Sequence, residues 1–463
     1  MNTIIHEVMK KITKDYTKNI EKLIGEKTDI SKFILETRKS LDQVGAELVG
    51  RALEIVDDVV RDSKNRKKEY YIQRRDDEKT FLTEFGEINY RRTYYKNKKD
   101  GSYTYLSDDM VGIEPYARMD LSLEAALVEK SLDLSYKKSG EAISTISSVS
   151  KQTVMNSIRR LGDVENSAVK IDMVKKVVNT IYIDADEDHV AMQQGTNKQI
   201  KLIYVHEGRK EISKGRYELI NKRYFTGSLK NNEELWLEVA NYLDEAYELD
   251  KVKKIYLSGD GASWIKEGLN WIPGSKYVLD YFHLSKYIRI GTAHMPPCFH
   301  TIINNYIDNL DRESVLGMFD VIIEQTEKET KKKAVNKSKT YIKNNWEGIE
   351  RRYDEDYMGC SAEGHISHIL SSRLSSRPLG WSLTGADQMA RLRVYRANGG
   401  NIYELMSQKK EEEKKEKRIF KLDQRVVKRK LKTSTNETID NIPLINDGRR
   451  TWGRQYLKAL RGA

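Results

Sequence analysis

Cysteine and proline are scarce in this chain. Its 463 residues include only two cysteines, Cys298 and Cys360, and six prolines. Two cysteines exclude a disulfide scaffold and a zinc module built on four cysteines, and no CxxC pair is present. A chain so poor in cysteine fits a reducing, cytoplasmic setting. Because proline interrupts helices, the low proline content predicts long helices.

Long apolar runs are also missing. No stretch approaches the ~18 apolar residues that a membrane-spanning helix needs. The first residues turn to charge too soon for the apolar region of a secretory signal. One third of all residues are charged and 38% are apolar. This composition predicts a globular protein with a buried core and no membrane partner.

Positive charge is in excess, but two short segments account for it. The chain holds 81 Lys and Arg against 70 Asp and Glu, a formal charge of +11. Residues 61–100 carry a net charge of +5 and residues 409–432 carry +7, so the remainder is nearly neutral. A basic excess permits nucleic acid, an anionic membrane or an acidic protein as partner. Its concentration in two segments favours contact with phosphates.

The period of the apolar residues changes along the chain and divides it into six parts. Between residues 175 and 300 the predicted order is β-β-β-α-β-α-β-α, which is expected for a ribonuclease-H-like α/β domain rather than a Rossmann half. We expect helices at 1–78, a small β-hairpin with a helix-turn-helix at 79–165, the first part of the α/β domain at 175–300, a helical insertion at 301–355, the last part of the α/β domain at 356–408, and a basic tail at 409–463.

Two short helices are expected on either side of a polar turn near residue 145. Ser135 and Ser150 are their expected N-caps. The spacing resembles a DNA-binding helix-turn-helix, although an ordinary helical hairpin has the same pattern and is commoner. The basic residues of the second helix are the candidate DNA contacts: Lys151, Arg159 and Arg160.

Acidic side chains occur where two strands are expected to end. In the first strand, Asp184 and Asp186 share one face because strand side chains alternate. The second strand ends at Asp260, which stands between two glycines that allow a sharp turn. Each acid alone is also compatible with a solvated strand end. Together they are candidates for a common site.

A third acid, Glu363, lies in the first turn of a helix expected over residues 361–376. It lies three residues before Ile366 and seven before Leu370, so the helical period places it on the apolar stripe facing the sheet. An inward carboxylate is costly unless it is paired or binds a cation. A first-turn glutamate that complements the helix dipole is the alternative. With the strand acids it suggests a site for two Mg²⁺ or Mn²⁺ ions.

Four stretches resemble the DDE transposases, most closely the bacterial ISLre-type insertion-sequence family, which is related to the Mutator superfamily. They are Ile183-Asp-Ala-Asp-Glu-Asp-His-Val, Tyr256-Leu-Ser-Gly-Asp-Gly-Ala-Ser-Trp-Ile, Leu279-Asp280-Tyr-Phe-His283-Leu, and Gly359-Cys-Ser-Ala-Glu363-Gly-His through Trp381. The third resembles the (C/D)xxH element of that superfamily. Asp186 to Asp260 spans 74 residues and Asp260 to Glu363 spans 103, with the expected helical insertion in the second gap.

The resemblance implies an enzyme that cuts DNA with Asp186, Asp260 and Glu363 as metal-binding catalytic acids. Asp184 stays an alternative first acid and Glu404 an alternative third. Asp280 and His283 would support the site, and Arg373 and Arg377 would contact phosphates. The histidine pair His365 and His368 and the group His294, Cys298 and His300 are weaker zinc candidates.

The partners that the resemblance implies are terminal inverted repeats and target DNA, with a homo-oligomer that joins two ends. A cytoplasmic, nucleoid-associated bacterial location would follow. Two other functions are compatible with the sequence: a ribonuclease-H-like nuclease without transposition, and a non-enzymatic DNA-binding protein derived from a transposase.

Overall fold

A computed structural model describes the chain except for residues 1, 26–28, 144–147, 228, 378–379 and 416–463. Among the described residues, no helix combines the length and apolarity needed to cross a membrane. The chain divides into two compact units. The first takes the described residues of Met1–Ser131, Ser135–Met155 and Ile402–Ala463, and the second takes Leu132–Leu134 and Asn156–Asn401.

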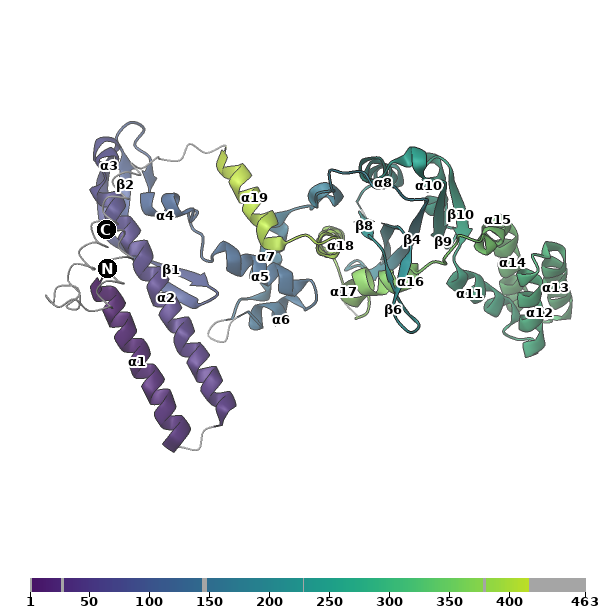
Figure 1. The fold of residues 1–463 in the computed structure, drawn as a ribbon, viewed down its shortest axis with the longest axis horizontal. Helices are drawn as coiled ribbons and strands as arrows, with labels where there is room; N and C mark the ends of the chain where they lie inside the picture. Colours follow the sequence, from purple (N-terminus) through teal and green to yellow (C-terminus); the bar gives the residue numbers. More distant parts are fainter. Residues whose placement is uncertain (1, 26–28, 144–147, 228, 378–379, 416–463) are drawn as a thin grey trace, which may run out of the picture. The chain divides into compact units, whose positions relative to one another are not determined.

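The first unit combines helices with a three-stranded antiparallel sheet of order β1-β2-β3 (Figure 1). Its long helix α2 covers β2, where Val60 packs with Tyr95. The predicted hairpin is present, but β1 begins at Tyr70, so the predicted boundary at residue 78 falls inside that strand. The elements are α1 (Asn2–Gly25), α2 (Ile30–Asp62), α3 (Lys64–Glu69), β1 (Tyr70–Thr83), β2 (Gly86–Asn97), β3 (Tyr103–Thr104), α4 (Leu106–Val111), α5 (Leu121–Ser131), α6 (Tyr136–Glu141), α7 (Lys151–Leu161) and α19 (Ile402–Lys415).

The two capped helices predicted around residue 145 are α6 and α7. The Ser135 side chain accepts a hydrogen bond from the Lys138 N–H, as an N-cap does. The turn between the helices needs a glycine at Gly140, where an added Cβ would lie 1.9 Å from the Val149 carbonyl oxygen. The helical pair is therefore confirmed, while its interpretation as a DNA-reading motif stays a prediction.

The second unit is built on a five-stranded mixed sheet of order β10-β9-β4-β5-β8. Strand β4 pairs in parallel with β9 and antiparallel with β5. The third strand of the predicted order, expected as one strand over residues 217–225, is wrong as a single element: Asn221, at φ 49°, separates β7 from β8, and β7 pairs with β6 instead of joining the five-stranded sheet. The strands are β4 (Thr180–Ala191), β5 (Asn197–His206), β6 (Arg209–Ser213), β7 (Arg216–Leu219), β8 (Arg223–Thr226), β9 (Lys254–Gly259) and β10 (Ser275–Leu279).

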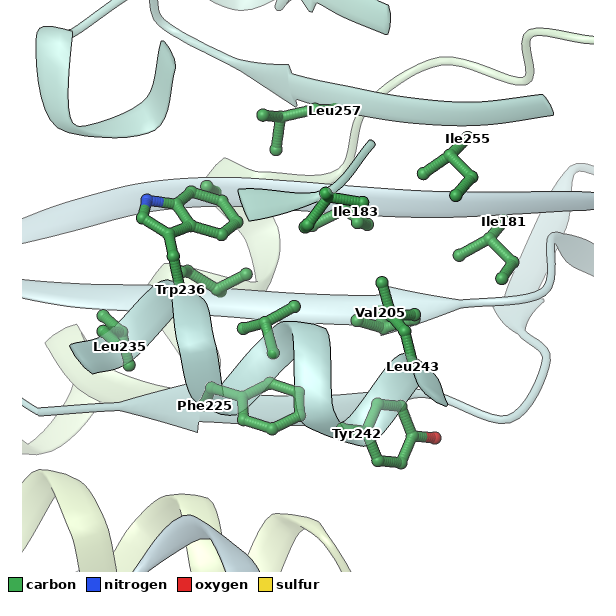
Figure 2. Packing of buried hydrophobic residues seen from close by; sticks show 14 of the residues in the cluster. Ile181, Ile183, Val205, Phe225, Leu235, Trp236, Tyr242, Leu243, Ile255 and Leu257 are labelled. Carbon is green, nitrogen blue, oxygen red and sulfur yellow. The ribbon is translucent and has the colours of Figure 1, made fainter. Parts of the chain in front are cut away.

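One face of the sheet carries the main apolar core. Alternate β4 residues Ile181, Ile183 and Ala185 point into it, opposite Trp236 and Leu243 of α8 (Figure 2). Buried apolar area supplies most of the stabilisation here. The side chains of the residues between these apolar residues, which include the acids, therefore lie on the opposite face of β4. The helices on the sheet are α8 (Asn232–Ala246), α9 (Ser263–Lys266), α10 (Gly268–Trp271) and α11 (Tyr281–Thr292), with the 3₁₀ turns η1 (Asn166–Ala168) and η2 (Leu249–Lys251).

A group of helices follows α11, as the sequence predicted for 301–355. It has its own core, in which Phe319 and Ile342 pack on Ile288 of α11. The bundle joins the sheet edge through α15, which contacts β10. Its elements are α12 (Pro297–Asp308), α13 (Arg312–Gln325), α14 (Glu329–Asn344), α15 (Trp346–Glu350) and the 3₁₀ turn η3 (Arg351–Tyr353).

The segment after the bundle returns to the sheet and departs from the predicted single helix over 361–376. It contains a π-helical turn, and its buried residues recur every four positions from Ala362 to Leu374. A π turn has more residues per turn than an α-helix. It therefore keeps the buried side of the segment on the sheet, whereas a regular α-helix would rotate that side away. The elements are α16 (Ala362–Ile366), η4 (Ser367–Ser371), α17 (Ser372–Leu374) and α18 (Leu383–Ala397). Of the predicted charged helix at 409–432, the end of α19 is described and the rest lies outside the described residues.

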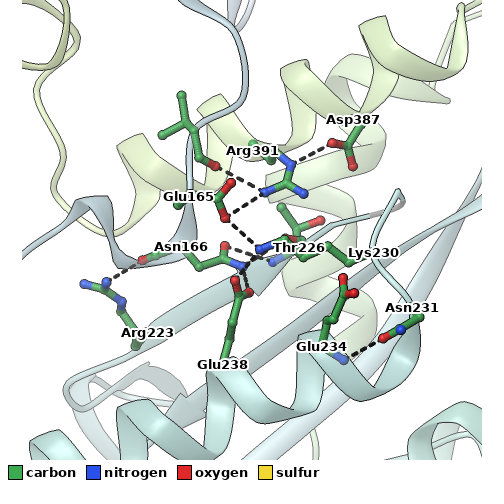
Figure 3. Close-up of polar contacts among 11 residues, drawn as sticks. Glu165, Asn166, Arg223, Thr226, Lys230, Asn231, Glu234, Glu238, Asp387 and Arg391 are labelled. Carbon is green, nitrogen blue, oxygen red and sulfur yellow. Dashed lines mark hydrogen bonds and ion pairs between the residues drawn. The ribbon is translucent and has the colours of Figure 1, made fainter. Parts of the chain in front are cut away.

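A polar network fixes α18 against η1 and α8 (Figure 3). The Arg391 guanidinium lies 2.6 Å from the Asp387 carboxylate and also reaches Glu165 and the Val164 carbonyl. Lys230 completes the group with an ion pair to Glu165 at 2.6 Å. Arg391 and Asp387 are both buried, so the opposite charge of each stabilises the ionised form of the other.

We expect Arg391→Met to lower the free energy of unfolding by about 3–5 kcal/mol, because it removes the guanidinium that pairs with the buried Asp387 charge. Urea unfolding of the purified protein measures this loss. Lys251→Ala, which breaks an exposed pair with Glu248, is the control and should cost at most about 1 kcal/mol. Equal losses in the two variants would contradict the role given to the buried pair.

Candidate active site

Three aspartates alternate along β4 on the face away from the main core. Asp184, Asp186 and Asp188 are all buried. Their spacing follows from the two-residue period of the strand, since the residues between them are core or edge residues. Three carboxylates so close together repel one another, so each needs its own means of stabilisation.

The two outer aspartates hold the segment that carries Glu363. Asp184 accepts hydrogen bonds from the Tyr204 hydroxyl at 2.6 Å and from the Ser361 N–H at 3.3 Å. Burial opposes ionisation of Asp184, but these bonds and the nearby His206 ring keep its pKa below the ordinary value. Asp188 accepts a hydrogen bond from the Ser375 hydroxyl at 2.7 Å. The segment 361–375 is thus fastened to β4 at both ends.

The middle aspartate, Asp186, is left facing the site. Its side chain accepts a hydrogen bond from the N–H of the next residue, Glu187, at 2.8 Å. Burial is the largest of the effects that together raise the pKa of Asp186 to about 7: the charges of Asp260 and Glu363 add to it, while the Glu187 N–H and His283 oppose it. The three predicted acids and His283 are therefore electrostatic neighbours. Asp184, the alternative first acid, is engaged in holding Ser361.

Asp260 follows the last residue of β9, as predicted. The parallel register pairs Asp184 with Ser258, so its continuation by two residues brings Asp186 level with Asp260. Of the two flanking glycines, only Gly261 has a positive φ, at 88°. Gly259 is required for a different reason, because a side chain would not fit there: an added Cβ would lie 2.8 Å from the Ala185 carbonyl oxygen. The Asp260 side chain accepts a bond from the Ala262 N–H at 2.8 Å.

Asp280 and His283 act as a pair at the start of α11. The Asp280 carboxylate caps the helix by accepting from the N–H groups of Phe282 and His283, and it lies 3.0 Å from His283 Nδ1. Burial lowers the pKa of His283, but Asp280, Asp186 and Asp260 outweigh burial and raise it overall. The helix cap therefore also orients a histidine toward the acids.

Glu363 is exposed, so the expectation that it lies on the buried stripe is wrong. The buried positions of the segment are Ala362 and Ile366, one residue before Glu363 and three after it. Glu363 sits in the first turn of α16 and acts on Asp186 through its charge. Glu404, the alternative third acid, belongs to the first compact unit, whereas Asp186 and Asp260 belong to the second.

The donors at this site are all carboxylate oxygens, which are the ligands that Mg²⁺ and Mn²⁺ accept. Within the part of the chain that the structure describes, no three His, Cys, Asp or Glu side chains converge closely enough to enclose a metal ion. The pKa of Asp186 is raised mainly by burial and also by the charges of Asp260 and Glu363, so negative charge is gathered at this place. The residues fit a cation that keeps waters or substrate oxygens among its ligands.

The predicted basic contacts have different environments. Arg373 is buried and its guanidinium lies over the Trp381 ring at 4.8 Å, so it packs inside the fold rather than facing a ligand. Arg377 is exposed. On α7, the candidates are exposed beside buried Val154 and Ile158. These exposed candidates are Lys151, Arg159 and Arg160.

The zinc candidates are not gathered into a site in the described residues. His365 bonds to the Tyr224 hydroxyl at 2.7 Å, and burial lowers its pKa to about 4. His294 bonds to Thr326. Sequence reasoning assigned no role to Asp188 or Tyr341, yet Asp188 accepts a hydrogen bond from Ser375 and the Tyr341 hydroxyl donates to the Asp260 carbonyl. In the sequence, the alternation of three aspartates was the one signal that could have indicated a role for Asp188.

Asp186 makes metal-free stability depend on pH. Its folded-state pKa of about 7 exceeds the ordinary 3.8, so the native state binds this proton more tightly than the unfolded chain. Its contribution is therefore present below pH 4 and is lost as pH rises toward 7. We expect Asp186→Asn to be more stable than the parent at pH 8 by on the order of 1–4 kcal/mol.

Urea unfolding in the presence of a chelator measures this difference at pH 5 and pH 8. Asp250→Asn, at an exposed position, is the control and should change stability equally at both pH values. A benefit of Asp186→Asn that does not grow between pH 5 and pH 8 would show that Asp186 ionises normally.

Comparison with known proteins identifies the family. The model of an uncharacterised protein family, UPF0236, matches residues 7–430. Two similar proteins come from Caldanaerobacter subterraneus subsp. tengcongensis. One is 41% identical over 460 residues, covering 97% of this chain and 96% of its own length, and its name joins eleven locus names. UPF0236 protein TTE2489 is 41% identical over 450 residues, covering 95% of each chain. This chain therefore belongs to the UPF0236 family.

Proposed function

We propose that this protein is a DDE transposase of an insertion sequence. The observation that carries the proposal is the electrostatic coupling of Asp186 with Asp260, Glu363 and His283. These residues come from four separate stretches of the chain, and the sequence had already indicated each of them as a candidate. Clustered carboxylates with a perturbed pKa are typical of catalytic sites.

The strand arrangement supports a ribonuclease-H-like catalytic domain. In chain order, the first three strands of the sheet are β4, β5 and β8, and β5 alone runs antiparallel to β4. Strands β9 and β10 then add in parallel on the other side of β4. Acids on the central strand and at the tip of its parallel neighbour lie at one end of the sheet. Ligand sites of open α/β sheets form at such ends.

The family comparison supports a mobile element. A similar protein whose name joins eleven locus names is the pattern expected of a gene that copies itself within a genome. The basic segment at 61–100, which spans β1 and β2, and the exposed cations of α7 are suited to DNA phosphates. We therefore assign terminal inverted repeats and target DNA as the substrates, and a homo-oligomer as the form that joins two ends.

The residues divide the chemistry among them. Asp186, Asp260 and Glu363 would hold two Mg²⁺ or Mn²⁺ ions. Such ions supply an activated hydroxyl and stabilise the leaving oxygen in displacement at phosphorus. The turn at Gly261 fixes Asp260 at the strand end. His283, with its pKa raised and its Nδ1 held by Asp280, places positive charge beside Asp186 and can keep that carboxylate ionised.

The test is Mn²⁺-dependent cleavage of a duplex that carries the repeat flanking the gene. We expect Asp260→Asn and Glu363→Gln each to slow cleavage by roughly 10³-fold or more, because metal ions supply several kcal/mol of transition-state stabilisation. Glu404→Gln, at the rival acid, is the matched control and should cleave at the parent rate.

Three outcomes decide against parts of the proposal. Cleavage that survives in Asp260→Asn and Glu363→Gln would remove these two acids from the triad, and its loss in Glu404→Gln alone would favour Glu404 as the third acid. Cleavage without joining of the freed 3′-hydroxyl to a second duplex would favour a nuclease over a transposase. Equal binding to repeat and random duplexes across salt concentrations would remove sequence-specific recognition of the ends.

A further inference from the structure

A pocket of about 500 Å³ opens next to Asp260 in the second unit. Helix α14 forms one wall, Tyr287 of α11 contributes to the lining, and Gly261 and Lys266 line the side nearest the acids. Most of the residues that line the pocket carry a polar group, and no carboxylate is among the described residues of its lining. Its lining therefore differs from the acidic site beside it.

Two stacked aromatic rings form part of the lining. Tyr287 and Tyr341 lie with ring centroids 3.7 Å apart and planes 17° from parallel, and both are partly exposed. The Tyr341 hydroxyl donates to the Asp260 carbonyl, so the stack is anchored to the turn that carries the catalytic acid. Tyr287 follows His283 by four residues and lies on the same side of α11. One helix thus serves the acids and the pocket.

Positive charge and amides complete the lining. Lys266 is half-buried, its Nζ lies 5.0 Å from the Tyr277 ring centroid, and the Asp260 charge acts on it. Lys337 is exposed on α14. Asn336 and Asn344 add side-chain amides, and the Asn336 Nδ2 donates to the Lys332 carbonyl while its oxygen stays available as an acceptor. Together these groups suit a nucleotide: the aromatic surface can stack on the base, the cations can contact the phosphate, and the amides can hydrogen-bond to the edge of the base.

We propose that this pocket receives one unpaired nucleotide of a DNA strand, with the base on the Tyr287–Tyr341 stack and the phosphate at Lys266 and Lys337. A base inside a duplex is covered on both faces by its neighbours and cannot stack on a side chain, so the nucleotide must leave the helix. The position beside Asp260 places it next to the cleaved bond. That location rests on the proposed function, whereas the binding itself does not.

The experiment measures binding of the full chain in a chelator, so that cleavage plays no part. The probes are a fluorescein-labelled blunt duplex and the same duplex extended by three unpaired thymidines. We expect the extended duplex to bind about ten-fold more tightly, in line with the usual effect of base–aromatic stacking. Tyr287→Leu and Lys337→Glu should each remove this preference for the extended duplex. Their affinity for the blunt duplex should stay close to that of the control variant Lys331→Glu.

Lys331→Glu is the matched control, since Lys331 is exposed on α14 but does not line the pocket. It should keep the preference. Equal binding of the two duplexes by the parent, or a preference that survives in both pocket variants, would overturn the proposal. Thymidine 5′-monophosphate should compete weakly and abolish the preference at high concentration. If it bound more tightly than the extended duplex, the pocket would be a site for a free nucleotide instead.

The two proposals can fail separately. Glu363→Gln should lose cleavage and keep the preference for unpaired thymidines. A parent protein that never cleaves, yet loses the preference in Tyr287→Leu and Lys337→Glu, would remove the proposed function and leave the pocket assigned. Because Lys337 is exposed, its variant keeps the test valid if Tyr287→Leu fails to fold.

Discussion

The alternation of aspartates on β4 is the constraint on which the rest of the site depends. One face of the strand is committed to the apolar core, so Asp184, Asp186 and Asp188 share the other. All three are buried, but they have different partners. Asp184 and Asp188 accept hydrogen bonds from the segment that carries Glu363, whereas Asp186 accepts one from the N–H of its neighbour Glu187. The outer two aspartates therefore position the segment of Glu363, and Asp186 is the one that we propose as a cation ligand.

The second requirement is that the acids stand on rigid elements. Asp186 lies within a central strand and Asp260 at the tip of the neighbouring parallel strand, while His283 is held by a helix cap. Gly259 and Gly261 have different reasons to be glycine, one a close approach and the other a left-handed turn. Sites supported in this way keep their geometry before substrate arrives, which reduces the cost of reorganisation.

The helical bundle after α11 has its own core and yet extends the site. Its helix α14 supplies Tyr341, which reaches the Asp260 turn, and the polar pocket that lies beside it. Carboxylates repel phosphate, so the DNA-cutting function that we propose needs cations close to the acids. Lys266 and Lys337 line the pocket beside Asp260 and would supply them locally, which the formal charge of +11 does not reveal.

The sequence by itself determined which residues have the chemistry and most of the elements that bear them. Period-two alternation placed Asp186 opposite the core, and the Gly-Asp-Gly turn placed Asp260 at a strand end, because both follow from local backbone geometry. Only the tertiary structure decided between Asp184 and Asp186, since both share a face and differ in what packs above them. It also decided that Glu363 is exposed, because packing on the sheet buries Ala362 and Ile366 of α16 and leaves Glu363 on the outer side of the helix.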